Sequence, residues 1–293
     1  MMPLSKNISS PSPATEVCLQ ALLRASALGV SVLMLLLLAF VTQASWGFLH
    51  EPTRWLGGAV WHPLEQRYGM LAMLAATLVS SALAMLIVVP VGLVVAIWGR
   101  FFAGKVVGTA YRALMGVMAS VPSVVYGLWG LTVLVPVING IAPPGASLLA
   151  GVLILAAMIL PVLVLQADLA LHEAARRHFA GALALGLSRS SAVRRVLLPA
   201  SLARLRPAFL LQTGRALGET MAVLMVCGNV VQWPSGLFAP VRTLTANIAL
   251  EMSYATGIHQ QALFASGWLL MLLVLLLMLA ARASDADAEH AAR

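Results

Sequence analysis

Long apolar runs separated by short polar segments dominate this 293-residue chain. A run of about 20 apolar residues is enough to cross a bilayer. The candidate runs are 25–48, 70–98, 112–138, 146–167, 207–232 and 260–281. They predict an all-α, polytopic membrane protein with six transmembrane helices. The composition supports this prediction, because 61% hydrophobic and only 10% charged residues are not typical of a soluble globular domain.

The polar ends of the chain suggest its division into parts. Residues 1–24 are predicted to form an N-terminal tail, residues 25–281 the membrane domain, and residues 282–293 a polar, disordered C-terminal tail. The first apolar run is too long for the core of a signal peptide. We therefore expect it to remain as a spanning helix.

Lysines and arginines are distributed unequally between the two sides that six spans would create. Fourteen of the 18 fall on the side of the N-terminus, three fall on the opposite side, and Arg215 lies inside a span. Because Lys and Arg accumulate in cytoplasmic loops, this bias predicts that both termini are cytoplasmic. Membrane topology thus accounts for the net charge of +8, and no nucleic-acid partner is expected.

The predicted inside loop, 168–206, is unusually long and carries seven arginines. Loops of this length usually carry function. We expect two short helices, the first covering 171–185. Gly186 would break it, and Ser188 would cap a second helix that runs to Leu198, before Pro199.

The second helix of this loop is amphipathic. Val193, Val196 and Leu197 fall on one face, with arginines around the remainder. Such a hairpin could lie on lipid headgroups or insert into a groove of a partner. The composition alone does not choose between the two.

The fifth apolar run contains only two charged residues, Arg215 and Glu219. Ionisable groups inside a spanning helix are costly and are presumed functional. Their separation of four residues would place both on one face of a continuous helix. One interpretation is a salt bridge that neutralises itself inside a bundle. The other is a solute pathway in which Arg215 meets an anion.

Small residues form a second line beside this charged pair. Gly214, Gly218 and Ala222 are also spaced by four residues. Small side chains at this spacing let another helix approach closely. We therefore expect a helix-packing stripe along the same segment.

The loop also carries a recognisable motif. Gly186, Val196, Leu198 and Pro199 keep the spacing found in the loop of ABC importer permeases: a glycine, nine residues, then aliphatic-x-Leu-Pro. In that family the loop docks into the ATP-hydrolysing subunit, so the resemblance implies an ATPase coupling loop here. Ala180 stands where the family usually has a glutamate, which removes one expected docking contact.

Further stretches resemble the PstC-type family of phosphate importer permeases. They are 121–136 (VPSVVYGLWGLTVLVP), 214–229 (GRALGETMAVLMVCGN), 61–69 (WHPLEQRYG) and 241–249 (VRTLTANIA). The resemblance implies a type I ABC importer permease fold in the bacterial inner membrane. It also implies transport of inorganic phosphate with a PstA-type sister permease, a PstB-type ATPase dimer and a PstS-type phosphate-binding protein.

No cofactor is expected in this chain itself. The sequence has no GxxxxGK[ST] loop. The resemblance therefore assigns ATP and Mg²⁺ to the partner ATPase, and ATP hydrolysis to that separate subunit.

The chemistry of the fifth run agrees with an anionic solute. A guanidinium offers bidentate hydrogen bonds to an oxyanion such as phosphate. Glu219 would keep the empty site near neutral charge. It could also accept a hydrogen bond from a protonated phosphate oxygen, which sulfate cannot offer at neutral pH.

Other functions remain open from the sequence. The closest alternatives are import of another oxyanion and the PstA-type role. An intramembrane enzyme would need a nucleophile or a metal set, and the six histidines and two cysteines show no such spacing. A passive membrane anchor would have no need of Arg215 and Glu219.

Overall fold

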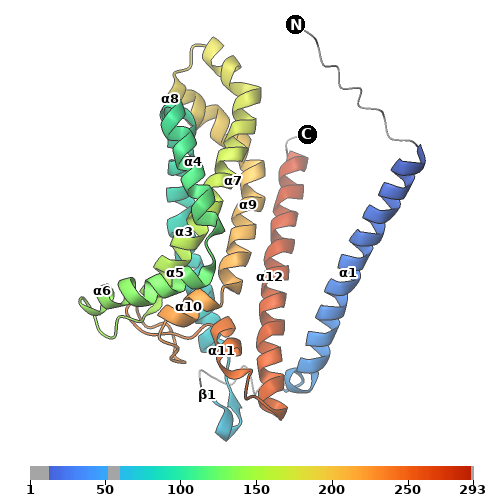
Figure 1. The fold of residues 1–293 in the computed structure, drawn as a ribbon, viewed down its shortest axis with the longest axis vertical. Helices are drawn as coiled ribbons and strands as arrows, with labels where there is room; N and C mark the ends of the chain where they lie inside the picture. Colours follow the sequence, from blue (N-terminus) through green and yellow to red (C-terminus); the bar gives the residue numbers. More distant parts are fainter. Residues whose placement is uncertain (1–12, 52–59, 292–293) are drawn as a thin grey trace.

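The computed structural model describes residues 13–51 and 60–291, and this part of the chain is mostly helical (Figure 1). Three of the helical segments, η2, η3 and η4, are π-helical, and η1 is a 3₁₀ turn. The elements up to the first long loop are α1 (Pro13–Leu49), β1 (Trp61–His62), η1 (Pro63–Glu65), β2 (Arg67–Tyr68), α3 (Leu71–Ile97), η2 (Trp98–Phe102), α4 (Lys105–Ser120), α5 (Ser123–Trp129), η3 (Gly130–Leu134) and α6 (Val135–Asn139). The remaining elements are α7 (Leu148–Ala184), α8 (Arg189–Ala192), η4 (Val193–Leu197), α9 (Leu198–Gly218), α10 (Met221–Val226), α11 (Leu244–Glu251) and α12 (Gly257–Ala291).

Four helices of the described residues are long and apolar enough to cross a membrane. They comprise Leu19–Leu49, Leu71–Phe102, Leu148–Ala184 and Gly257–Ala280. A fifth span results if the bent pair of α4 with α5–α6 is counted as one. The all-α prediction is confirmed, whereas the count of six straight spans is not.

Different elements lie at the two ends of the helical bundle. Figure 1 shows the start of α1, the end of α12 and the turn between α7 and α8 at one end of the molecule. The β1–β2 hairpin lies at the opposite end, where Trp61 pairs with Tyr68. The start of α1 and the end of α12 therefore lie at the end of the bundle that carries the α7–α8 turn.

α7 is the centre of the fold. It packs along α3 and also contacts α4 and α9. Its inward side chains are almost completely buried, among them Ile154, Leu155, Met158, Ile159 and Leu163. α1 lies outside this core and packs mainly on α12, where the rings of Phe40 and Phe264 meet edge to face.

The predicted third span, 112–138, is not one straight helix. α4 and the α5–α6 segment meet at 92°. Val121 and Pro122 are extended at the break, with ψ of 128° and 143°. Proline disfavours the helical conformation in the residue before it, so the sequence itself causes this bend.

The predicted fifth span, 207–232, is also broken. α9 ends at Gly218, Glu219 is extended with ψ of 132°, and only the short helix α10 follows. The prediction of one continuous helix from 207 to 232 is therefore wrong. Glycine stabilises a helix less than other residues do, and the break begins at one.

The predicted loop 168–206 is mostly helix. α7 continues unbroken through its first half to Ala184, so the short helix expected at 171–185 is the end of a long one. The helix expected to stop before Pro199 instead continues into α9. η4 ends at Leu197, and Pro199 falls in the first turn of α9, where a missing N–H breaks no helical hydrogen bond.

Helices extend into both of the predicted terminal tails. α1 begins at Pro13, inside the tail expected at 1–24, and residues 1–12 lie outside the described part. α12 reaches Ala291, so most of the tail expected to be disordered at 282–293 is helical. The polar composition of this tail suggested disorder, although the preceding helix continues through it.

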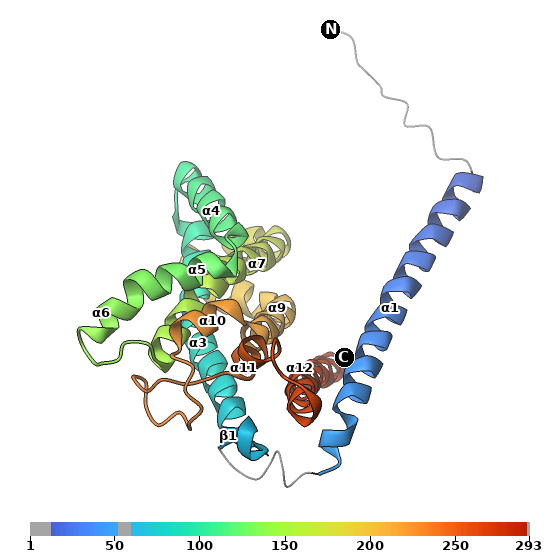
Figure 2. The same cartoon turned by 60° about the horizontal axis from the view of Figure 1, so that its bottom comes forward.

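A close contact joins α5 to α10, which lie side by side in Figure 2. A Cβ added at Gly127 would meet Met225 Sδ at 2.9 Å and Ala222 Cα at 3.0 Å. We expect Gly127→Leu to destabilise the protein by about 1–3 kcal/mol, because overpacking of this size forces backbone shifts. Thermal unfolding in detergent would measure this loss.

Gly116→Leu on α4 is the matched control, because a Cβ at Gly116 would meet nothing within 4 Å. Equal stability of the two variants would show that the α5–α10 contact is not tight.

Candidate functional site

Arg215 and Glu219 lie on either side of the break between α9 and α10. Arg215 occupies the last turn of α9, where a cation interacts favourably with the negative end of the helix dipole. Its side chain is exposed in this chain. Glu219 is half-buried and caps α9, and the chain leaves the helical conformation after it.

Glu219 is held by two hydrogen bonds. Its Oε1 accepts from the Ala222 N–H at 3.3 Å, and its carbonyl accepts from Thr245 Oγ1 at 2.7 Å. These contacts tie the break to the start of α10 and to α11. The carboxylate is therefore fixed independently of Arg215.

The interpretation of a self-neutralising salt bridge loses its geometric basis. Among the ion pairs of the described residues, none joins Arg215 to Glu219. The extended backbone at Glu219 redirects the chain that follows it, so α10 does not continue the axis of α9. Irregular backbone inside an apolar segment is tolerated where it is buried in protein or lines a polar cavity. The break thus favours the pathway interpretation.

The small-residue stripe is divided by the same break. Gly214 faces α12, where an added Cβ would lie 3.6 Å from Met278 Cε, and Ala222 packs against Gly127. Gly218 has nothing within 4 Å of an added Cβ. The expected single packing face along 214, 218 and 222 is therefore wrong, because α9 ends before it is complete.

A buried amide pair lies one turn before Arg215. Gln212 Nε2 donates to Gln166 Oε1 at 3.1 Å, and Gln212 Oε1 has no partner although the side chain is only 2% exposed. Sequence reasoning missed this pair. The signal was present, because a glutamine inside an apolar run is costly and stands three residues from Arg215.

The hairpin between α7 and α9 has the expected turn. Gly186 adopts φ of +80°, which residues with a Cβ rarely adopt, and Ser188 Oγ accepts from the Ser191 N–H. The predicted helix break at Gly186 and the cap at Ser188 are confirmed.

The apolar face of the second helix is not free for a partner. Val193 and Leu197 are 4% and 0% exposed, and they pack into a cluster with α7 side chains such as Leu171. Val196 and Leu198 are partly buried against the same cluster, while Pro199 is exposed. The expectation that a partner groove buries this face is therefore wrong, because the chain covers it with its own α7.

The tip of the hairpin, residues 183–190, is largely exposed. Leu185 is 85% exposed there. Gly186, Ser188 and Arg189 are exposed beside it. An exposed leucine beside an exposed arginine offers both an apolar and a charged contact for a partner.

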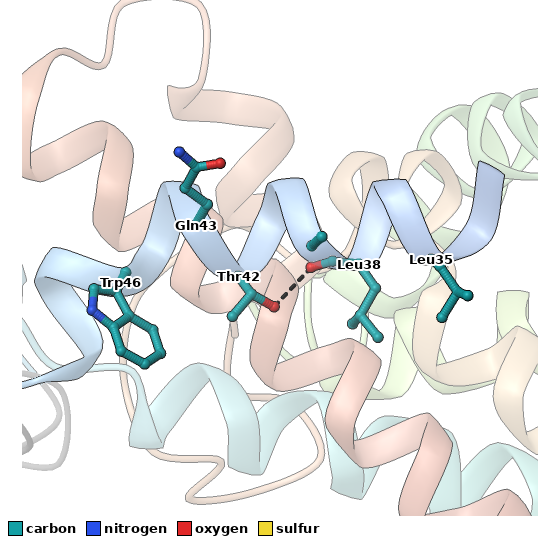
Figure 3. A pocket seen from close by; sticks show the side chains of 6 residues that line it. Leu35, Leu38, Thr42, Gln43 and Trp46 are labelled. Atoms are coloured by element: carbon teal, nitrogen blue, oxygen red, sulfur yellow. Dashed lines mark hydrogen bonds between the residues drawn. The ribbon is translucent and has the colours of Figure 1, made fainter. Parts of the chain in front are cut away.

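A groove of about 600 Å³ lies on α1, and Figure 3 shows that its side chains come from this one helix. Thr42 Oγ1, the hydroxyl in the groove, donates to the Leu38 carbonyl at 2.7 Å. The lining residues are Leu35, Leu38, Ala39, Thr42, Gln43 and Trp46. None is charged, so this groove offers nothing to bind an anionic solute.

A family model described as "Binding-protein-dependent transport system inner membrane component" matches residues 88–289, which is more than half of the chain. The chain belongs to this family of inner-membrane permeases. The matched region of the permease includes both the hairpin and the break between α9 and α10.

Two relatives carry the same name. The phosphate transport system permease protein PstC of Mesorhizobium japonicum is 31% identical, over 92% of this permease and 89% of its own length. The protein of that name from Haemophilus influenzae is 28% identical, over 87% and 88% of the two chains.

A solved structure shares the fold. A chain of the MetNI methionine ABC transporter, solved in inward-facing conformations, aligns with a TM-score of 0.56 and 22% identity, over 75% of this permease and 94% of that chain. At this identity the likeness shows the fold alone. The type I ABC importer permease fold is therefore confirmed.

Proposed function

We propose that this chain is the PstC-type permease subunit of an ATP-driven importer of inorganic phosphate. It would lie in the bacterial inner membrane with both termini in the cytoplasm. The observation that carries the proposal is the exposed guanidinium of Arg215 at a helix break inside an apolar run. The names of the relatives support phosphate as the anion.

Arg215 and Glu219 would have different roles in binding the anion. A guanidinium binds a tetrahedral oxyanion through two parallel hydrogen bonds, and Arg215 lacks a carboxylate partner among the described ion pairs. Glu219 is held in place by Ala222 and Thr245. It can accept a hydrogen bond from a protonated phosphate oxygen and oppose the binding of a fully deprotonated anion.

The conformational change driven by ATP hydrolysis would reach this chain through the hairpin tip. We assign the docking of a PstB-type ATPase dimer, which binds ATP and Mg²⁺, to residues 183–190, where Leu185 is exposed. A PstA-type sister subunit would complete the pathway beside Arg215. A PstS-type binding protein would deliver phosphate at the end of the bundle that carries β1 and β2.

The test is uptake by the reconstituted importer. Proteoliposomes with this chain, a PstA-type subunit, the ATPase dimer and the binding protein should accumulate labelled phosphate with ATP and at least about tenfold less without the ATPase. Excess unlabelled sulfate should compete weakly. Accumulation of sulfate in preference to phosphate would assign another oxyanion, and ATP-independent accumulation would contradict the importer.

A further inference from the structure

Asp168 is a buried carboxylate that the proposed transport site does not use. It lies on α7, is 3% exposed, and accepts from Arg100 Nε at 2.9 Å and from Arg100 Nη2. Arg112 Nη1 lies 3.6 Å from Asp168 Oδ1, and Tyr111 Oη donates to the same oxygen at 3.2 Å. One carboxylate therefore joins η2, α4 and α7.

η2 is joined to the hairpin at the next residue. Arg189 Nη1 donates to the Phe101 carbonyl at 2.9 Å, across 88 residues of sequence. The buried Phe101 ring lies 5.7 Å from the ring of Phe179 on α7. The hairpin tip and Asp168 therefore both bind η2, through Phe101 and Arg100 respectively.

η2 is packed closely against α4. A Cβ added at Gly99 would overlap the Tyr111 ring, and one added at Gly108 would lie 3.1 Å from the Gly99 carbonyl. η2 and α4 therefore touch through backbone. A displacement of η2 must carry α4 with it.

α4 leads directly to the site at the helix break. The bend at Val121 and Pro122 joins α4 to α5, and Gly127 of α5 touches Ala222 of α10. The Ala222 N–H donates to Glu219. A continuous series of contacts therefore runs from the hairpin to Glu219.

We propose that Asp168 is a positioning residue for transport. Its ion pairs hold η2 and α4 against α7, so that a movement of the hairpin also displaces α5 and α10. The proposal rests on the proposed function for its ATPase partner, but not for the identity of the solute. A buried ion-pair cluster can hold three elements in a fixed arrangement, because several charge-assisted hydrogen bonds converge on one carboxylate and fix its orientation.

The alternative role for Asp168 is to stabilise the fold only. A buried ion pair can be neutral for stability, yet removal of one partner leaves an unpaired charge. The two roles differ in what they change. A stabilising role alters the amount of complex, whereas a coupling role alters the solute moved for each ATP hydrolysed.

The decisive variant is Asp168→Asn in the complete reconstituted importer. We expect the ATPase dimer to remain bound and ATP to be hydrolysed, with phosphate moved per ATP reduced by about tenfold or more, within the usual range of coupling between sites. Asp168→Glu should restore part of this ratio, because it returns the carboxylate. Arg189→Gln should lower the ratio while leaving the Asp168 cluster intact.

Glu173→Gln is the matched control. Glu173 lies on the same helix and also faces two arginines, Arg176 at 3.9 Å and Arg204 at 3.7 Å, but at a more exposed position. It should leave the ratio unchanged. The ratio is read on assembled complexes, with their thermal unfolding measured in parallel.

Each outcome decides the proposal. A normal ratio in Asp168→Asn overturns it, as does a ratio that falls equally in Glu173→Gln. A complex that unfolds before assembly in Asp168→Asn, together with a normal ratio in Arg189→Gln, also overturns it, because the role is then structural. Failure of the wild-type importer to move phosphate would instead contradict the proposed function.

Discussion

Replacement of Arg215 by glutamine is expected to abolish phosphate uptake while the permease still inserts and assembles. The guanidinium is exposed in this chain, and no ion pair of the described residues neutralises it. Loss of one partner of a desolvated charge pair costs about 2–5 kcal/mol, which is roughly 30-fold or more in rate. Initial rates of labelled phosphate uptake, normalised to assembled complex, measure the effect.

Two variants sharpen this experiment. Arg204→Gln removes a cation from the same helix, where Arg204 already pairs with Glu173, and should leave most uptake intact. Arg215→Lys keeps the charge but loses the bidentate geometry, so uptake should be intermediate. Near-normal uptake in Arg215→Gln would remove this residue from the pathway.

Replacement of Leu185 by aspartate together with Gly186 by valine is expected to release the ATPase subunit and stop uptake. Leu185 is 85% exposed at the hairpin tip, compared with 43% for Leu183. Gly186 has φ of +80°, and a residue with a Cβ pays about 1–2 kcal/mol for a left-handed conformation. Pull-down of the ATPase with detergent-solubilised permease measures docking.

The control for this pair is Gly181→Val on α7. An added Cβ meets nothing within 4 Å at Gly181 or at Gly186, but only Gly186 has a positive φ. The Gly181 variant should therefore keep its ATPase. Retained ATPase and retained uptake in the Leu185 and Gly186 double variant would contradict docking at the tip.

The sequence predicted the helical class and most helix positions, because long apolar runs have few other structures available in a membrane. It failed where backbone geometry overrides hydropathy. Pro122 bends the third run, and Glu219 interrupts the fifth, although hydropathy is continuous across both. The path of α7 into the hairpin was missed because polarity changes there while helix propensity does not.

The residues of the candidate site are proposed from the sequence, and the structure adds the backbone geometry around them. Arg215 and Glu219 stand out as charges in an apolar run, but hydropathy does not show that the helix ends at Gly218. The amphipathic face with Val193 and Leu197 was real, yet the pattern cannot tell which surface covers it. Asp168 was missed because its partners Arg100 and Arg112 are distant in sequence.

The uninterrupted course of α7 sets a rule for exchanging parts between permeases. An α-helix turns by about 100° per residue, so adding one residue between Asp168 and Gly186 would aim the hairpin tip in another direction. Seven added residues, close to two full turns, would keep its direction and move it outward by about 10 Å. Chimaeras that borrow the tip of a related permease must therefore match the rotational phase of this helix, and not only its length.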